Sequence, residues 1–127
     1  MVIIMSSFKD NKTPETNKTR HESLRGILNF QGFLFQEVEG QYEGRRETSV
    51  ICFPLDLRQE EEIYKLAWAF GQETVLVMQD SKDCFLLSKE INIKYVGVWI
   101  EVEAEKISEI ENWSKIGERF FTVRRED

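Results

Sequence analysis

The chain has little of the material from which most catalytic and metal sites are built. Its 127 residues include one histidine, His21, and two cysteines, Cys52 and Cys84. A single histidine cannot supply a multi-histidine metal site, and it leaves Ser/His/Asp catalysis almost without candidates. The cysteines lack the paired spacing of a zinc motif, and the seven glycines form no phosphate-binding loop. We therefore expect neither a metal nor a cofactor.

Long apolar runs and prolines are also scarce. No run approaches the roughly 20 residues that span a bilayer, and the opening run of residues 1–5 is too short for a signal peptide and has no basic residues before it. With two prolines, 41% hydrophobic and 31% charged residues, the composition is typical of one compact domain over residues 1–127. Both cysteines lie inside apolar runs, which favours buried free thiols in a cytoplasmic protein.

Positive charge is in short supply. The chain has 23 acidic and 17 basic side chains, a formal net charge of −6. Such a field repels phosphate backbones and anionic lipid surfaces. Neither nucleic acid nor a membrane is expected as a direct partner, and the sequence leaves the oligomeric state open.

The hydrophobic pattern predicts two main helices. Thr13 and Pro14 have the character of an N-cap and a first helical residue for a helix over 14–30, and Asp56 with Gln59 resembles a capping box for a second helix that ends at Gly71. Strands are expected at 2–8, 33–38, 47–53, 74–78, 85–87, 95–102 and 117–123, while 103–113 stays ambiguous. The predicted fold is α+β, with a single mixed, mainly antiparallel sheet and the two helices packed on one face.

Polar residues occupy several positions where apolar ones would be the simpler choice for a core. They are Asn17, Arg20, Glu47, Ser49 and Gln72. One interpretation is a structural network in which an Arg20–Glu47 pair fastens the first helix to the sheet. Another is a polar pocket for a small anionic, nucleotide-like ligand, with Arg20 contacting the anion; a third is that some of them face solvent. A carboxylate beside an arginine stays ionised and is a poor general acid, which favours binding over catalysis.

Short motifs in the first two thirds of the chain give a family resemblance. They are Asn17-Lys18-Thr19-Arg20, Gly32-Phe33, Glu47-Thr48-Ser49 and Phe70-Gly71-Gln72-Glu73, within residues 6 to 88. With these motifs the chain resembles a family of small uncharacterised bacterial and phage proteins, a domain of unknown function. The resemblance implies no activity, but it suggests that the polar positions recur as a set and favours an accessory role in a phage or mobile element.

Three functions follow from these observations. The main hypothesis is a stoichiometric inhibitor of a host defence factor, whose binding surface is an acidic row able to meet the basic groove of a nucleic-acid-binding protein. An ordinary solvated face is the more common explanation of any single charge run. The row consists of Glu101, Glu103, Glu105, Glu109 and Glu111. The first alternative is a binder of the small anionic ligand. The second is a small hydrolase or transferase that uses Glu47 with Ser49.

Overall fold

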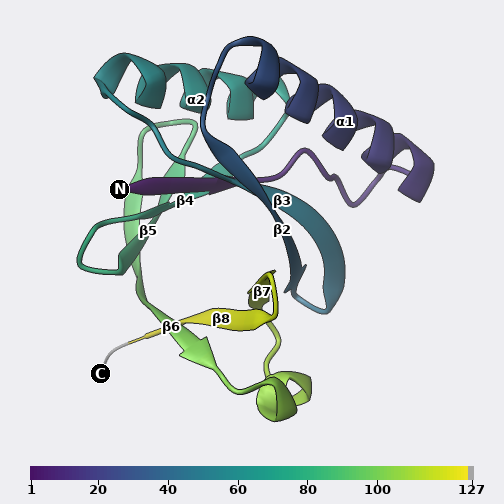
Figure 1. Ribbon diagram of the computed structural model, residues 1–127, viewed down its shortest axis with the longest axis vertical. Coiled ribbons are helices and arrows are strands. Elements are labelled where there is room, and N and C mark those ends of the chain that lie inside the picture. Colours follow the sequence, from purple (N-terminus) through teal and green to yellow (C-terminus); the bar gives the residue numbers. More distant parts are fainter. Residues whose placement is uncertain (126–127) are drawn as a thin grey trace.

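Strands closed into a barrel, with two helices across its outer wall, make up the computed structural model, which describes residues 1–125 (Figure 1). The strands are β1 (Val2–Met5), β2 (Phe35–Tyr42), β3 (Arg45–Cys52), β4 (Thr74–Met78), β5 (Asp83–Ser88), β6 (Ile93–Val102), β7 (Trp113–Ile116) and β8 (Arg119–Arg124). The helices are α1 (Pro14–Phe30), α2 (Leu57–Ala69) and the short 3-10 helix η1 (Ala104–Glu109).

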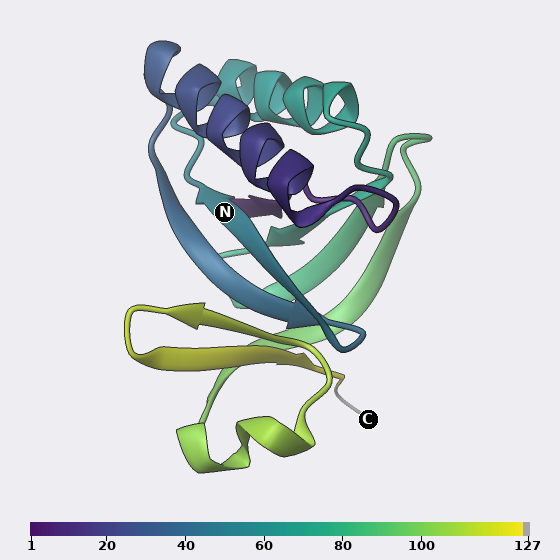
Figure 2. The ribbon, with the colours of Figure 1, turned by 90° about the vertical axis from the view of Figure 1, so that its right-hand side faces the viewer.

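The barrel closes in the order β1-β3-β2-β7-β8-β6-β5-β4, and every neighbouring pair is antiparallel. The α+β class and the two main helices are confirmed. The expected mixed sheet is corrected to a wholly antiparallel one, which closes on itself because β1 pairs with both β3 and β4 and the β7–β8 pair joins β2 to β6. Residues 103–113 hold η1 and lead into the β7–β8 hairpin, which lies on the side of the barrel away from α1 and α2 (Figure 2).

Both main helices begin where their capping residues predict. Thr13 accepts a hydrogen bond from Thr16 N at 3.1 Å, and Asp56 accepts one from Gln59 N at 2.8 Å. The Gln59 side chain accepts in turn from Leu55 N at 2.9 Å, so it caps one residue earlier than a standard capping box. Local sequence therefore fixes the helix starts.

The sheet has a separate apolar core on each face. On the outer face, α1 and α2 pack against β1, β3 and β4 through a fully apolar cluster that includes Ile3, Leu24, Leu28, Val50 and Ile63. A second cluster lies inside the barrel, and its buried members are Ile4, Val38, Ile51, Met78, Cys84 and Trp99. Alternation along each strand produces this division, because successive side chains point to opposite faces.

The β6 strand has a bulge beside Gly97. The register between β5 and β6 shifts beside Cys84, where Gly97 has a φ of +135°. A Cβ at this position would lie 2.4 Å from the carbonyl oxygen of Arg124 on β8, so only glycine lets the two strands approach this closely.

Both cysteines are free and buried, as expected from the sequence. Burial raises the pKa of the Cys52 thiol to about 12 and that of the Cys84 thiol to about 11. Neither thiol is therefore a reactive nucleophile near neutral pH. Over residues 1–125, no helix is long and apolar enough to cross a membrane.

Candidate functional site

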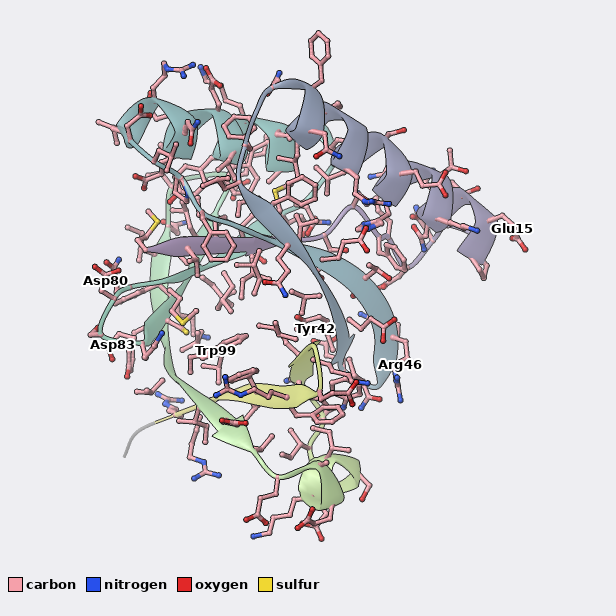
Figure 3. The ribbon with its side chains drawn as sticks, viewed as in Figure 1. Glu15, Tyr42, Arg46, Asp80, Asp83 and Trp99 are labelled. Atoms are coloured by element: carbon pink, nitrogen blue, oxygen red, sulfur yellow. The ribbon has the colours of Figure 1, made fainter. Side chains whose placement is uncertain are left out.

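The barrel interior contains a pocket of about 510 Å³, and part of the inner apolar cluster lines it. Its lining comes from β1, β2, β3, β4, β5, β6, β7 and β8 and from the loops at that end. Tyr42 and Trp99 both lie within the ring of strands (Figure 3). The volume falls within the roughly 300–1,000 Å³ of pockets that hold small molecules.

Hydroxyl groups and a carboxylate form one wall of the pocket. On β3, Glu47 and Ser49 line the pocket, whereas Val50 and Cys52 belong to the outer core. On the neighbouring strands, the Tyr42 hydroxyl lies 3.0 Å from Ser114 Oγ. Sequence alternation on β2 and β3 thus places polar groups inside the barrel, where most small barrels have apolar filling.

Burial raises the pKa values of two groups in this wall. Desolvation is the main cause that raises the pKa of the Glu47 carboxyl, and the charge of Asp10 raises it further. A hydrogen bond from Ser6 and the charge of Arg45 act in the opposite direction. The pKa of Tyr42 is also raised, first by burial, while its bond to Ser114 opposes the rise and the charge of Glu47 adds to it. Both groups are therefore harder to ionise here than in water.

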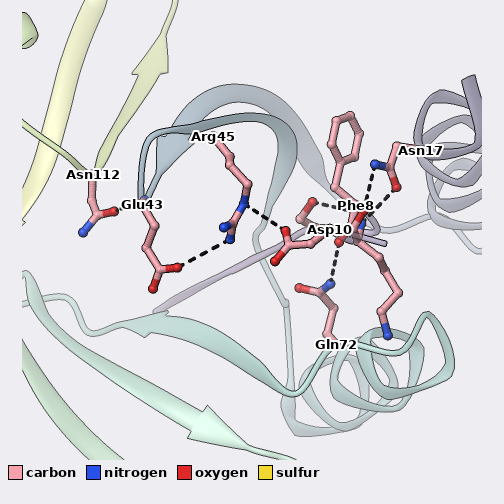
Figure 4. Close-up of polar contacts among 9 residues, drawn as sticks. Phe8, Asp10, Asn17, Glu43, Arg45, Gln72 and Asn112 are labelled. Atoms are coloured by element: carbon pink, nitrogen blue, oxygen red, sulfur yellow. Dashed lines mark hydrogen bonds and ion pairs between the residues drawn. The ribbon is translucent and has the colours of Figure 1, made fainter. Parts of the chain in front are cut away.

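Arg45 lies at the mouth of the pocket, but acidic neighbours already engage its charge. Its guanidinium Nε lies 2.9 Å from Asp10 Oδ1, and a terminal nitrogen lies 3.5 Å from Glu43 Oε2 (Figure 4). The backbone N–H of Glu43 donates to Asn112 Oδ1 at 2.7 Å, which ties the β2–β3 turn to the segment before β7. In the part of the chain that the structure describes, Glu47 has no ion-pair partner.

Apolar and aromatic side chains form the opposite wall. Trp99 of β6 and Phe121 of β8 stack with their ring centroids 5.3 Å apart and their planes at 17°. Leu76, Leu86 and Val96 extend this surface along the pocket. A ligand that fits between the two walls needs a polar or cationic side and a flat, apolar side.

The structure divides the polar residues that the sequence singled out. Glu47, Ser49 and Gln72 line the pocket. Asn17 instead exchanges two hydrogen bonds with the backbone of Lys9, at 2.9 and 3.1 Å. The Arg20 guanidinium donates to the carbonyl oxygens of Ser7 and Phe70 rather than pairing with Glu47. These contacts fasten α1 to the chain before it and to the end of α2.

The acidic row lies outside the pocket. Glu101 forms a bidentate ion pair with Arg119, at 3.0 and 2.7 Å, and this pair lowers the pKa of Glu101. The other four carboxylates lie in exposed positions in and around η1, and they are Glu103, Glu105, Glu109 and Glu111. That the row contacts a partner remains a prediction.

Sequence reasoning missed much of the pocket. Tyr42 and Ser114 fell outside the expected strands, Trp99 and Phe121 looked like ordinary strand residues, and only the closed barrel brings all four into one pocket with Glu47. The signal that could have found Tyr42 and Ser114 is the same one that found Ser49, a polar group at an inward position of a strand.

The pocket lacks the usual catalytic groups. Among residues 1–125, its lining contains no histidine, cysteine or lysine. No group of three or more histidine, cysteine or acidic side chains within that range could hold a metal ion. The arrangement can bind a small molecule, shield it from water and place a carboxylate beside a positive centre.

Fold and site together define a small α+β barrel protein with an acidic, partly aromatic pocket of small-molecule size. The family model of the S-adenosylmethionine lyase family matches residues 3–124, and the chain belongs to this family. No curated protein matches the chain.

Family membership corrects three expectations drawn from the sequence. The family is not one of unknown function, the family indicates an enzyme, and stoichiometric inhibition of a host factor is not its function. The family's implied small-molecule substrate carries a nucleoside, as the first alternative supposed, but it is a sulfonium cation rather than an anion. The expectation of a non-enzyme was wrong for a chemical reason. A sulfonium carries a good leaving group, the neutral thioether, so its cleavage does not require the protein nucleophiles whose absence argued against catalysis.

Proposed function

We propose that this chain cleaves S-adenosylmethionine in the barrel pocket without adding water. The observation that carries the proposal is Glu47, a partly buried carboxylate in the pocket lining with a raised pKa and no ion-pair partner among the described residues. A desolvated carboxylate of this kind is stabilised when a cation binds beside it. The family supplies a substrate with that charge.

Overall charge supports the same substrate. S-adenosylmethionine carries a sulfonium, an ammonium and a carboxylate, so it is a net cation at neutral pH. The chain has a formal net charge of −6, and its field attracts such a molecule toward the acidic pocket mouth. An anionic ligand would meet the opposite field, with Arg45 already held by Asp10 and Glu43.

The two walls of the pocket suit the two ends of this substrate. Trp99, with Leu76 and Leu86 beside it in the lining, offers an apolar surface for the adenosine part. The hydroxyls of Tyr42, Ser49 and Ser114 offer hydrogen-bonding partners for the amino-acid part. Filling the pocket in this way excludes water from the reacting carbon.

The reaction needs no nucleophile from the protein. In the proposed step, a carboxylate oxygen of the substrate attacks its own Cγ, the Cγ–S bond breaks, and the bonding electron pair passes to sulfur. The products are homoserine lactone and methylthioadenosine, and all atoms of the substrate are retained in them. The pocket contributes by holding the substrate's flexible chain in the folded conformation that brings oxygen and carbon together.

Such an activity offers a role in a phage or mobile element. Removal of S-adenosylmethionine would deprive host methyltransferases and any defence enzymes that require it. The accessory role that the sequence suggested would then act through depletion of a metabolite, so one enzyme molecule would act on many substrate molecules.

The test is product analysis with purified chain and S-adenosylmethionine in water enriched in oxygen-18. We expect methylthioadenosine and homoserine lactone, with no heavy oxygen in freshly formed lactone. Homoserine labelled from the start would indicate hydrolysis, and an unsaturated amino acid would indicate removal of a proton from the substrate. A folded chain that leaves the substrate intact would overturn the proposal.

A further inference from the structure

A second hollow, of about 540 Å³, lies on the outer face of the barrel, and none of its lining residues lines the pocket inside. We call it the outer groove. Residues of α1 form one side of it, and residues of β2, β3 and β7 form most of the other. Seven of its ten lining residues have titratable side chains, so this part of α1 covers a polar surface rather than the apolar core that it shares with α2.

On the helix side, four polar residues of α1 follow one another at spacings of three and four residues, which places them on one face. They are Lys18, His21, Glu22 and Arg25. The buried His21 has its Nε2 3.1 Å from Glu37 Oε1, and Arg25 Nε lies 2.5 Å from the same oxygen. This cluster joins α1 to β2 and engages the charges of Arg25 and Glu37. Lys18 and Glu22 form no ion pair with any residue from 1 to 125.

On the strand side, Glu39 and Lys115 are register partners across β2 and β7, yet they do not pair with each other. Both line the groove, because Val38 and Ser114 beside them point into the barrel. Cross-strand neighbours have Cβ atoms about 4.5–5.5 Å apart, close enough for an ion pair. The Lys115 ammonium instead lies 5.6 Å from the centroid of the Phe120 ring on β8, the strand on the other side of β7 from β2.

The outer groove therefore has two ammonium groups and two carboxylates that form no ion pair within the described chain. They belong to Lys18, Lys115, Glu22 and Glu39. A phosphate or a dicarboxylate would be repelled by both carboxylates, and a diamine by both ammonium groups. A molecule with one charge of each sign can pair with both kinds of group.

The rest of the lining limits the size and polarity of such a molecule. Among residues 1–125, the groove has no phenylalanine, tyrosine or tryptophan in its lining, so it offers no ring on which a base could stack. We infer that the outer groove is a binding site for a small polar α-amino acid, whose ammonium contacts Glu39 and whose carboxylate contacts Lys115. The two contacts are charge-assisted hydrogen bonds, and Lys18 and Glu22 add a second charge of each sign from α1.

The test compares three related probes, L-serine, ethanolamine and 3-hydroxypropanoate, by NMR titration of the nitrogen-15-labelled chain. Ethanolamine is serine without its carboxylate, and 3-hydroxypropanoate is serine without its ammonium. We expect serine to cause saturable shifts of backbone amides around Glu39 and Lys115, and the other two probes to bind at least about tenfold more weakly, because each loses one ion pair. Equal binding of either partial probe would overturn the inference, because the groove would then recognise a single charge. Shifts that do not saturate, or that lie elsewhere, would overturn it as well.

Charge-exchange variants test the two assigned contacts. Glu39→Lys alone and Lys115→Glu alone place like charges side by side, and each should weaken serine binding at least about tenfold. The double variant has one charge of each sign again, and a zwitterion can bind it in the reversed orientation, so its affinity should return to within about threefold of wild type. Lys106→Glu on η1 makes the same charge change outside the groove and should bind serine like wild type.

Thermal melting shows which variants fold. A folded double variant that does not bind serine would overturn the assigned contacts, and the probe comparison on wild type decides the inference even where a variant fails to fold. Since the readout is binding alone, the result is independent of whether the chain cleaves S-adenosylmethionine.

Discussion

The same strands form both faces of the barrel wall, but the two faces have different roles. On β3, Val50 and Cys52 point outward into a sealed, wholly apolar core beneath α1 and α2. Ser49 and Glu47 of the same strand point inward to the pocket. Apolar side chains fill the space on the outer face, whereas the space inside the barrel is filled only in part and leaves a pocket.

This difference shows how the fold tolerates an unfavourable site. Hydrophobic burial on the outer face supplies stability that does not depend on the inner one. The inner face can therefore keep unfilled space and a carboxylate whose ionisation is disfavoured, both of which lower stability. Mutations on the two faces should then separate stability from activity.

The largest effect is expected in the outer core. Ile63→Ala on α2 removes a side chain with no exposed surface and should lower the free energy of unfolding by about 2–5 kcal/mol, measured by urea denaturation. Activity per folded molecule should not change. Leu86→Ala is the matched variant on the inner face, and it should cost less because Leu86 is only partly buried and borders the cavity. Equal costs would contradict the division of roles.

Glu47→Gln should show the opposite behaviour. We expect kcat/KM for S-adenosylmethionine to fall about tenfold or more, mainly through a higher KM. The folded-state pKa of Glu47 is raised, so its ionisation destabilises the fold as pH rises through that pKa. The Gln variant should therefore match wild type in acid, where both side chains are neutral, and melt at a higher temperature at neutral pH. A lower melting temperature at neutral pH would refute this reasoning.

The sequence was enough to predict the helices but not the closed barrel. Thr13 and Asp56 are local signals that act within one turn of a helix. Closure depends instead on β1 pairing with both β3 and β4, and on the β7–β8 hairpin bridging β2 and β6. These pairings join distant segments, and no local pattern encodes them.

For the same reason, the sequence predicted only part of the site. Glu47 and Ser49 stood out because polar groups at inward strand positions are unusual, whereas Trp99 has an aromatic side chain that suits any strand. Arg20 was expected either to pair with Glu47 or to contact a ligand, because its backbone partners, Ser7 and Phe70, could not be foreseen. That one misplaced cation reversed the expected charge of the ligand.

A smaller effect is expected at the start of α2. Asp56→Ala removes the acceptor for Gln59 N and should lower the free energy of unfolding by about 1 kcal/mol, seen as a lower melting temperature. Asp56→Asn keeps an acceptor oxygen and should stay closer to wild type. Because α2 covers only the outer face, KM should be unchanged in both variants, and a changed KM would mean that the two faces are coupled.

The smallest effect is expected from the acidic row, which belongs to neither face. Changing all five carboxylates to glutamine alters the formal net charge from −6 to −1 (−6 + 5), without touching the pocket lining. The variant replaces Glu101, Glu103, Glu105, Glu109 and Glu111. These side chains are exposed, and salt screens them, so the melting temperature should stay within error. A weaker field should slow capture of the cationic substrate only slightly, and kcat/KM should fall at most about twofold at physiological ionic strength and not at all at high salt. A loss that persists at high salt would instead place the row in direct contact with the substrate.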